Sequence, residues 1–486
     1  MHADPNATVT GLVTDSSGQP ITGVRVSFTN INTHFSYRAE TNRQGIYRLY
    51  GLQPGNYRIN VNKDGFSSIV KGDVELHVQD EVSINFALKV GSVFESITVE
   101  DGTPLISLQS ASVSTVVDEQ FADNLPMNGR SFQTLIDLTP GVVLTPSSRS
   151  EAGQFSVNGQ RTNANYWTVD GVGANLGMTT RNLAGNGLAG GLPLFSVQGG
   201  TTSLVSLDTM REFRIETSSS APEFGRVPGA QISIVTRPGT NRWHGSLFDY
   251  IRNNALDAND WFANHAGLPK PAERQSDFGA TFSGPILKDR TFFFFSFEGL
   301  RLLLPQTTIA AVPDDASVAG GLSTRENAFP GMKPYLAAFP IPTGPEILAI
   351  CDPATDTECP PSGMKPSGAA TFNAVFSNRS VLDDYSLRID HAATRRLNLF
   401  ARYNHSPSTL QRREPLAMST VFQSHITTNT ATLGVIWNET PSISHDIRLN
   451  WSYIDASSNA VIDTFGGATP LPARSPRHRS RFPGNR

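Results

Sequence analysis

The chain has 486 residues, with 39 basic and 43 acidic side chains and a formal net charge of −4. This near balance predicts neither a nucleic-acid partner nor a strongly acidic one. Charged residues make up only 17%, beside 41 Gly and 32 Pro, so we expect short strands and long loops rather than helices. No stretch approaches the roughly 18 apolar residues of a spanning helix. The start, MHADPNATVTG, lacks the basic and apolar regions of a secretory signal.

The first 90 residues predict a small β-sandwich. Alternating runs are separated by the turn sequences SSGQP, NRQG, QPG and KDG, in which Gly supplies positive φ and Pro presets a turn. The runs are 7–15, 23–30, 45–52, 55–63 and 82–90. The ordered motifs GLVTDSSGQPITGV, TNRQGIY, GLQPGNY and KDGF resemble the carboxypeptidase regulatory-like domain. The fold that this resemblance implies is a sandwich of the transthyretin or starch-binding type.

Catalysis by this module is not expected. A zinc carboxypeptidase needs His and Glu ligands and a catalytic acid, and neither HxxE nor HExxH occurs in the chain. Neither a P-loop nor a G-x-S-x-G elbow is present. GNGLAG at 185–190 matches G-x-G-x-x-G, but GLPLF follows it where a dinucleotide site needs a helix. We therefore predict no catalytic, cofactor or metal site and no enzyme activity.

The region 93–237 is rich in Gly, Asn, Ser and Thr and contains three distinctive blocks. The block 125–142 predicts a short helix, capped by Asn128 or Ser131 and stopped by Pro140-Gly141, with its apolar side made of Phe132, Leu135, Ile136 and Leu138. The blocks 155–172 and 212–250 predict strands, and their Asn-Gly and Asp-Gly turns favour tight hairpins. In this order, the three blocks resemble the plug domain of Oar-like TonB-dependent outer-membrane transporters and its passage into the first barrel strand.

This resemblance implies that outer-membrane β-strands follow from residue 238. Such strands alternate apolar and polar residues over about ten positions, as DDYSLRIDH, RLNLFARYN and HDIRLNWSY do, with Phe400 an exception. A soluble sandwich would produce the same alternation in any single strand. Seven ranges are predicted as strands: 243–252, 276–286, 290–302, 380–391, 395–405, 427–439 and 443–456. Since plugged transporters close with 22 strands, the chain is expected to be C-terminally truncated, with about a third of a barrel.

RTFFFFSFEGLR at 290–301 is apolar on both faces of one strand. The face with Phe293, Phe295 and Phe297 is expected to meet lipid. Phe292 and Phe294, on the face that continues with Ser296 and Glu298, would then pack on the plug. A strand buried between two sheets is the alternative.

Two shorter segments are candidate sites. Cys351 and Cys359 lie in the longest predicted inter-strand segment, 303–379, and two cysteines closing a short loop favour a disulfide over a metal site.

In the resembling family, a short segment ahead of the plug pairs as a strand with the partner TonB. The candidate here is ESITVE at 95–100, centred on Ile97, Thr98 and Val99; a plain linker strand is an equal alternative.

The expected organisation is all-β. It comprises a sandwich at 1–92, a plug at 93–237, a partial barrel at 238–468, and a basic tail at 469–486 that is either a binding tail or a product of a shifted reading frame. We expect an outer-membrane protein with its first domain in the periplasm, made with a secretory signal ahead of Met1. The expected function is TonB-dependent uptake of an unknown solute, with carbohydrate and peptide as candidates and lipid and TonB as partners. A carbohydrate-binding or adhesion receptor is the alternative, although Tyr37, Tyr47, Tyr50 and Tyr57 form no obvious aromatic platform.

Overall fold

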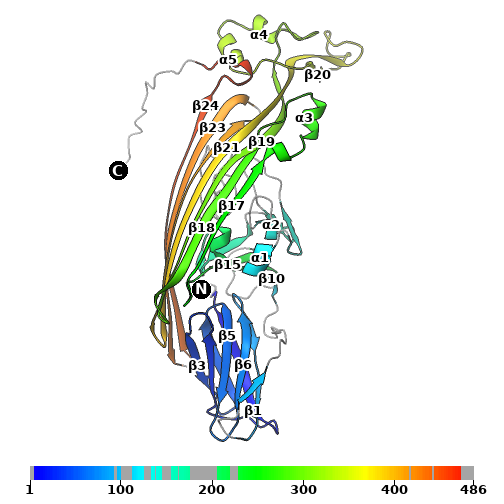
Figure 1. Ribbon diagram of the computed structural model, residues 1–486. Helices are drawn as coiled ribbons and strands as arrows, with labels where there is room; N and C mark the ends of the chain where they lie inside the picture. The colour runs from blue at the N-terminus through cyan, green and yellow to red at the C-terminus, as the bar shows by residue number, and fades with distance from the viewer. Residues whose placement is uncertain are drawn as a thin grey trace, which may run out of the picture.

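The fold is mostly β, as predicted. The computed structural model is shown in Figure 1. It describes residues 5–91, 96–99, 112–124, 133–136, 138–144, 155–161, 164–175, 205–218, 228–414, 417–440 and 443–471. An N-terminal sandwich lies at one end of a large curved sheet, and a smaller central domain, the described residues from 112 to 236, lies against one face of that sheet. Most of the basic tail and the glycine-rich stretch 185–190 lie outside the described residues.

The sandwich consists of two sheets. In the first, strands pair in the order β4-β1-β7, and β8 also pairs with β1; the bounds are β1 Ala7–Asp15, β4 Ile46–Leu52, β7 Glu81–Ser83 and β8 Phe86–Leu88. The second has the order β3-β2-β5-β6-β9, with bounds β2 Arg25–Asn30, β3 Ser36–Glu40, β5 Gly55–Asn62, β6 Ser68–Leu76 and β9 Ser96–Val99. Alternate residues of both sheets meet in one core around Phe28, Tyr47 and Tyr57, each at most 1% exposed. Burial raises the pKa of both tyrosines far above its usual range.

Strands β3 and β6 were not among the predicted runs. In β6 the buried hydrophobic residues are Ile69, Val74 and Leu76. Five positions separate Ile69 from Val74, so the alternation with a period of two is broken between them. The break coincides with Asp73, which has φ 53°, and with a register shift against β5. A bulge of this kind hides a strand from a search for strict alternation.

The central domain is built on a five-stranded sheet of order β10-β15-β16-β13-β14. Its strands are β10 Val113–Asp118, β13 Tyr166–Val169, β14 Val172–Gly173, β15 Met210–Ser218 and β16 Gln231–Thr236, and a separate pair joins β11 Val142–Leu144 to β12 Phe155–Val157. Helix α1 (Glu119–Asn124) follows β10 in the chain, and helix α2 (Gln133–Ile136) lies between α1 and β11. The core, around Trp167, Phe213 and Ile234, is independent of the sandwich core.

Helix α2 lies within the block predicted to be helical. Leu135 and Ile136 are buried as expected, but Leu138 is 60% exposed, so its placement on the apolar side was wrong. The helix ends at Ile136, and a turn begins at Leu138, which changes the direction of that side chain. The proposed caps and Phe132 are outside the described residues.

The large sheet is antiparallel, and neighbours in sequence are neighbours in space. Its order is β17-β18-β19-β21-β22-β23-β24, with the short β20 (Glu346–Ile350) paired to β21. The bounds are β17 His244–Asn253, β18 Arg274–Leu287, β19 Thr291–Pro313, β21 Met364–Thr394, β22 Leu397–Glu414, β23 Ala417–Thr440 and β24 Ile443–Ile462. Each of the seven predicted strand ranges overlaps one of these strands.

The strands run beyond the predicted ends. The segment 303–379, predicted to be one long loop, is corrected: β19 continues to Pro313 and β21 starts at Met364. What remains between them carries α4 (Thr324–Asn327), α5 (Lys333–Ala337) and β20. The sheet extends because the two strands stay paired from Leu303↔Arg379 to Pro313↔Ala369. Helix α3 (Trp261–His265) lies between β17 and β18, and no helix in the described part of the chain has the length and apolar character to cross a membrane.

Candidate functional site between the central domain and the large sheet

The large sheet has one polar face, and the central domain packs on it. On β21, Asp384, Ser386 and Arg388 are at most 5% exposed, whereas Tyr385 and Leu387, which alternate with them, are 41% and 42% exposed. The buried face contacts the central domain directly, since Thr209 Oγ1 lies 2.6 Å from Ser296 Oγ on β19. The period of two thus separates the surface that binds the central domain from the outward surface.

A tight turn delivers one carboxylate to this interface. Asp170 and Gly171 join β13 to β14 with φ of 49° and 79°, the two positive values of a type I′ hairpin turn. Asp tolerates the left-handed conformation better than most residues, and Gly adopts it without steric clash because it has no Cβ. The turn leaves the Asp170 side chain 2% exposed, pointing away from its own hairpin and into a polar interface.

The carboxylate of Asp170 is held from both sides. From its own domain, the backbone N–H and the hydroxyl of Thr236 donate to it at 2.9 Å. From the large sheet, Arg388 Nη1 donates to it at 3.1 Å, and Arg402 Nη1 lies 3.9 Å away. These charged groups are all nearly excluded from water, so the contact is a buried ion pair network rather than a surface salt bridge.

Arg388 and Arg448 orient the network. Arg388 grips Asp390 with two parallel hydrogen bonds of 2.9 and 2.8 Å, and its guanidinium lies 4.7 Å from the ring centre of Phe400. Arg448 makes a similar fork to Asp446 at 2.8 and 2.7 Å and donates to the backbone carbonyl of Asp170. Such forks fix the guanidinium plane, so the remaining donors are aimed at the turn.

Phe400, which breaks the alternation of β22, lies on the buried face. It is 6% exposed and pairs in register with Gly434 on β23. A Cβ at Gly434 would lie 2.0 Å from the Phe400 ring, so only glycine leaves room for the ring there. The ring in turn supports both Arg388 and Arg448, whose guanidinium carbons lie 4.7 and 5.6 Å from its centre.

The sandwich is attached to the central domain by a second set of ionic contacts. The segment 77–80, which follows β6, meets β15: His77 Nδ1 lies 2.9 Å from Glu212 Oε2, and the Val78 amide donates to Glu212 Oε1 at 2.5 Å. Arg214 pairs with Asp80 and donates to the carbonyl of Gln79. The sandwich also reaches the large sheet, because Asn6 Nδ2 donates to Asp446 at 2.9 Å.

We expect this attachment to weaken as pH rises. The hydrogen bond that His77 donates to Glu212 raises the pKa of His77 above its usual value near 6.5; burial opposes this, and the negative charges of Glu212, Asp80 and Glu75 add to it. A raised pKa means that protonated His77 stabilises the contact. This stabilisation is fully present below the pKa of a free histidine and is lost as pH rises through the higher pKa of His77 in the contact. The charged neighbours from both domains are Glu212, Arg214, Asp80 and Glu75.

The measurement is the protection of the Val78 amide against hydrogen exchange between pH 6 and 8.5, corrected for the intrinsic rate. Protection should fall with pH in the unaltered chain. In His77→Gln, which keeps a hydrogen-bond donor but does not titrate, the corrected protection of the Val78 amide should no longer depend on pH. The same slope in both proteins would contradict the role of His77.

The phenylalanine run lies on β19 with its two rows on opposite faces. Phe292 and Phe294 are 4% and 5% exposed on the side of the central domain, and Phe295 is 38% exposed on the other. Phe293 packs edge-on against Trp243, and Phe297 lies 4.9 Å from the ring of Tyr385. Contact of the outward row with lipid stays a prediction.

The outward face of the sheet has aromatic rows at two levels. Trp437 stacks on His445 with ring centres 5.1 Å apart, and further along β24 Trp451 and Tyr453 are 56% and 54% exposed. The stretch from His445 to Tyr453 covers about 26 Å along an extended strand. For a strand with the tilt of a barrel strand, this corresponds to a height of about 20 Å along the barrel axis. The exposed Ile447 and Leu449 lie between these levels. An apolar band between aromatic girdles is typical of a surface in lipid.

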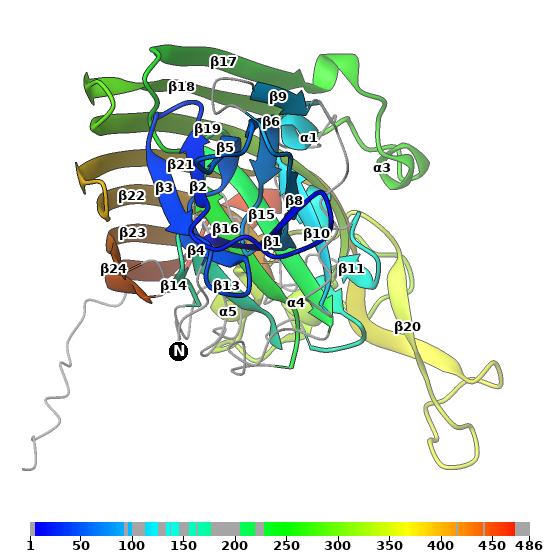
Figure 2. The same ribbon diagram turned by 90° about the horizontal axis from the view of Figure 1, so that it is seen from below.

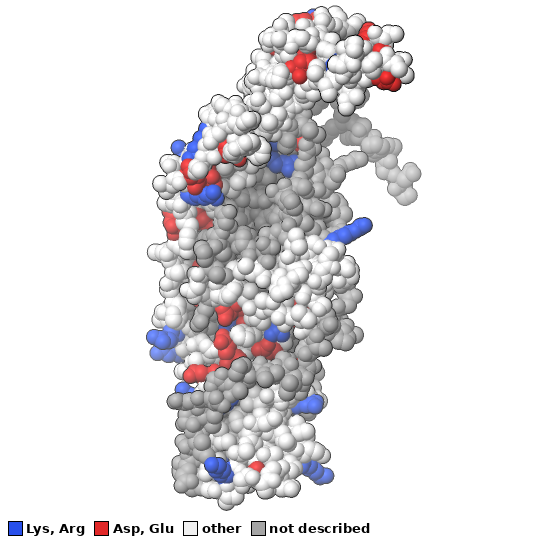
Figure 3. Space-filling model, turned by 90° about the vertical axis from the view of Figure 1, so that its right-hand side faces the viewer, with Lys and Arg blue, Asp and Glu red and all other residues white. Residues whose placement is uncertain are grey.

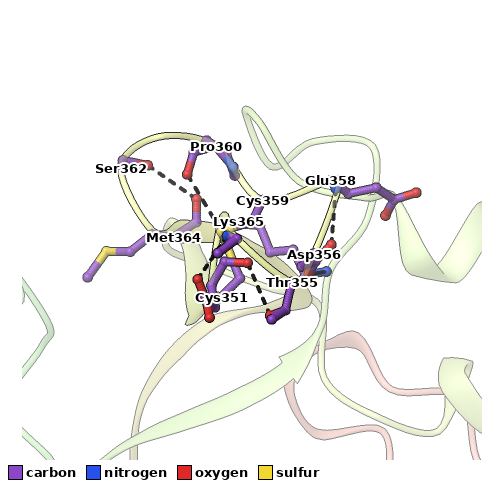
Figure 4. Close-up of a disulfide and its surroundings, with 11 residues drawn as sticks. Cys351, Thr355, Asp356, Glu358, Cys359, Pro360, Ser362, Met364 and Lys365 are labelled. Atoms are coloured by element: carbon purple, nitrogen blue, oxygen red, sulfur yellow. Dashed lines mark hydrogen bonds and ion pairs between the residues drawn. A yellow bond between two sulfur atoms is a disulfide. The ribbon is translucent and has the colours of Figure 1, made fainter.

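The structure joins Cys351 and Cys359 in a disulfide at the end of the sheet opposite the sandwich (Figures 1 and 4). The bridge closes a short loop after β20, in which Lys365 and Asp356 form an ion pair of 2.5 Å. The hydrogen bond from Lys365 lowers the pKa of Asp356. In the described part of the chain, no three His, Cys, Asp or Glu side chains gather as metal ligands would.

The candidate partner strand lies at the edge of the sandwich. Residues Ser96–Val99 form β9, which pairs in parallel with β6 through Ser68↔Ser96, Ile69↔Ile97, Val70↔Thr98 and Lys71↔Val99. Within the described residues, β9 is the last strand of its sheet. Three of the tyrosines considered for a carbohydrate-binding platform, Tyr37, Tyr47 and Tyr57, are buried in the sandwich core and do not form a surface.

Charge is mixed over the face seen in Figure 3, where acidic and basic side chains are interspersed without a large patch of one sign. The sequence alone had identified the polar face of β21 and β22 but had not singled out Asp170, Glu212 or Arg214. The Asp-Gly turn was the available signal for Asp170. The other two residues lie in an unremarkable strand, EFRIETS, whose partners are more than 130 positions away.

Comparison with known proteins places the chain in a family. Residues 235–484, more than half of the chain, match the outer membrane beta barrel domain, and residues 8–89 match the carboxypeptidase regulatory-like domain. The TonB-dependent transporter Oar of Myxococcus xanthus is 28% identical over 305 residues, which are 60% of this chain and 26% of that protein. The chain therefore spans about a quarter of the length of this curated relative.

Matches among solved structures include the outer membrane transporter YddB of Escherichia coli, with a TM-score of 0.46 and 12% identity, covering 70% of this chain and 39% of that one. A ferric enterobactin receptor of Pseudomonas aeruginosa has a TM-score of 0.41 and 13% identity, covering 70% and 40%. The chain is thus similar to the Oar transporter, carries a carboxypeptidase regulatory-like domain at its N-terminal end, and belongs to the outer membrane beta barrel domain family.

Proposed function

We propose that this chain supplies the periplasmic sandwich, the plug and part of the barrel wall of a transporter that takes up a solute by TonB-dependent active transport. In this proposal the sandwich is 1–92, the plug is 93–237 and the barrel segment is 238–468. The observation that carries it is the ionic interface around Asp170, which holds a separately cored central domain on the polar face of the wall.

The character of that interface suits a part that must move. Apolar burial would resist separation in water, whereas charged groups regain hydration when an ion pair opens. Trp167, Phe213 and Ile234 keep the central domain folded as a unit. A pull on the domain would therefore separate Asp170 from Arg388 and admit water before it unfolded the core.

The partner in this proposal is TonB, and the contact is β9. An extended strand at a sheet edge presents unpaired backbone groups, which is the physical basis of strand addition by a partner. Backbone pairing with β6 holds β9 extended and so prepares it for such a partner. The solute is not identified by these features; carbohydrate and peptide remain the candidates.

Thr98→Pro tests the contact, because proline removes a backbone donor from the centre of β9. We expect binding of the purified periplasmic domain of TonB to the full chain, measured by biolayer interferometry, to fall at least about tenfold, the loss of roughly one to two hydrogen bonds. Thr98→Val, which keeps the backbone N–H and a β-branched side chain, is the matched control. Equal binding by the proline variant would refute β9 as the contact strand, and absence of binding in all three would refute the TonB partnership.

A further inference from the structure

A cavity of about 590 Å³ lies between the sandwich and the adjacent end of the large sheet. The sandwich contributes residues from β2, β3, β4 and β5, and the sheet contributes the turn that joins β21 to β22 and the last residues of β23. Figure 2 shows β3 and β4 beside these strand ends, and β4 contacts both β23 and β24. The cavity therefore exists only where the two domains meet.

The charge of its lining is one-sided. Arg25 and Arg38 come from the sandwich, Arg395 and Arg396 from the β21–β22 turn, and Glu40 is the one carboxylate among the described residues that line the cavity. Tyr50, Asn62 and Asn438 add neutral hydrogen-bonding groups. Donors thus outnumber acceptors, since a guanidinium has five N–H groups and no acceptor.

Most of these guanidiniums are uncommitted. Within the described residues, the side chains of Arg25, Arg38 and Arg395 make no hydrogen bond or ion pair, while the Arg396 side chain donates to the carbonyl of Glu439. Glu40 lies opposite Arg25 in the β2–β3 register yet forms no ion pair with it. Like charges that share a cavity repel one another, and an anion between them converts that repulsion into attraction.

The cavity also lies at a defined depth. Asn438, in its lining, follows Trp437, which belongs to the aromatic row at the sandwich end of the apolar band. Aromatic rows of this kind mark the level of lipid headgroups. Arginine is suited to phosphate because its fork matches two phosphate oxygens at once.

We propose that the cavity between the sandwich and the β21–β22 turn binds a phosphate-bearing anion through Arg25, Arg38 and Arg395. The anion bridges the two domains, so binding stabilises the sandwich against the barrel wall independently of the contacts at Glu212 and Arg214. The same chemistry can come from an anionic lipid headgroup at the membrane surface or from a soluble phosphate in the periplasm.

The test compares Arg38→Gln/Arg395→Gln with Arg48→Gln/Arg58→Gln in the full chain. Arg48 and Arg58 are exposed sandwich arginines outside the cavity, and their side chains likewise make no hydrogen bond or ion pair within the described residues. Both double variants therefore lose the same charge. One arm titrates inorganic phosphate into the chain in zwitterionic detergent by calorimetry. The other measures retention on phosphatidylglycerol vesicles, with phosphatidylcholine vesicles as the reference. Thermal unfolding of each variant establishes that it is folded.

We expect the cavity variant to bind at least about tenfold more weakly than the unaltered chain, and the control variant less than about threefold more weakly. Loss in both arms supports a phosphate site open to either source; loss with vesicles alone assigns a lipid headgroup, and loss with phosphate alone a soluble ligand. A third variant, Arg38→Lys/Arg395→Lys, keeps the charge but not the fork and should bind with intermediate affinity. Equal loss in cavity and control variants, or no binding in either arm, would overturn the proposal.

Discussion

Asp170→Asn is expected to loosen the central domain from the barrel wall by about 3–5 kcal/mol, the usual cost of removing one partner from a buried ion pair. The substitution keeps the shape of the side chain, and Asn tolerates positive φ, so the turn is preserved. Arg388 keeps Asp390, but Arg402 then has no carboxylate from the central domain. The loss of this carboxylate from two buried guanidiniums is the source of the effect.

Hydrogen exchange of β13 and β16 and the urea midpoint of the full chain measure the effect. Asp64→Asn is the matched control, because Asp64-Gly65 is also an Asp-Gly turn but is exposed to solvent. A double-mutant cycle with Arg388→Gln should give a coupling of about 1–3 kcal/mol. Additive effects in the cycle, or equal effects of the two Asn variants, would show that Asp170 does not tie the domain to the wall.

Phe295→Arg is expected to destabilise insertion of the large sheet by about 2–4 kcal/mol, the cost of a basic residue on the lipid face of a barrel near the midplane. Phe295 points outward from β19 and lies in register between Phe282 and Leu387, within the apolar band. A guanidinium there would lose its hydration in hydrocarbon.

The measurement is the urea midpoint of the full chain folded into phosphatidylcholine vesicles. Ile309→Arg is the matched control, since Ile309 is a 63% exposed apolar residue on the same strand beyond the aromatic rows. The control should cost less than about 1 kcal/mol, as at interface positions. If both variants cost the same, the outward row of β19 does not face lipid.

Local patterns were sufficient for much of the architecture. The alternation in DDYSLRIDH assigned Arg388 and Asp390 to one face and Leu387 and Ile389 to the other, because the side-chain period of an extended strand is two. The Asp170-Gly171 turn was predictable because few residues adopt two successive positive φ values. Leu138 and the extent of the 303–379 loop were predicted wrongly, since a helix end and the length of a paired strand depend on contacts with other segments.

The sequence by itself therefore determined the β class, the sandwich and the two faces of the barrel strands, all of which follow from periodicity and turn chemistry within about ten residues. Only the tertiary structure decided which charges meet. Arg388 and Asp170 are 218 positions apart, and Arg214 and Asp80 are 134 apart. It also brought Arg25 and Arg38 to the same cavity as Arg395. Local sequence patterns do not predict pairings over such separations, because each residue fits the alternation of its own strand equally well with any distant partner.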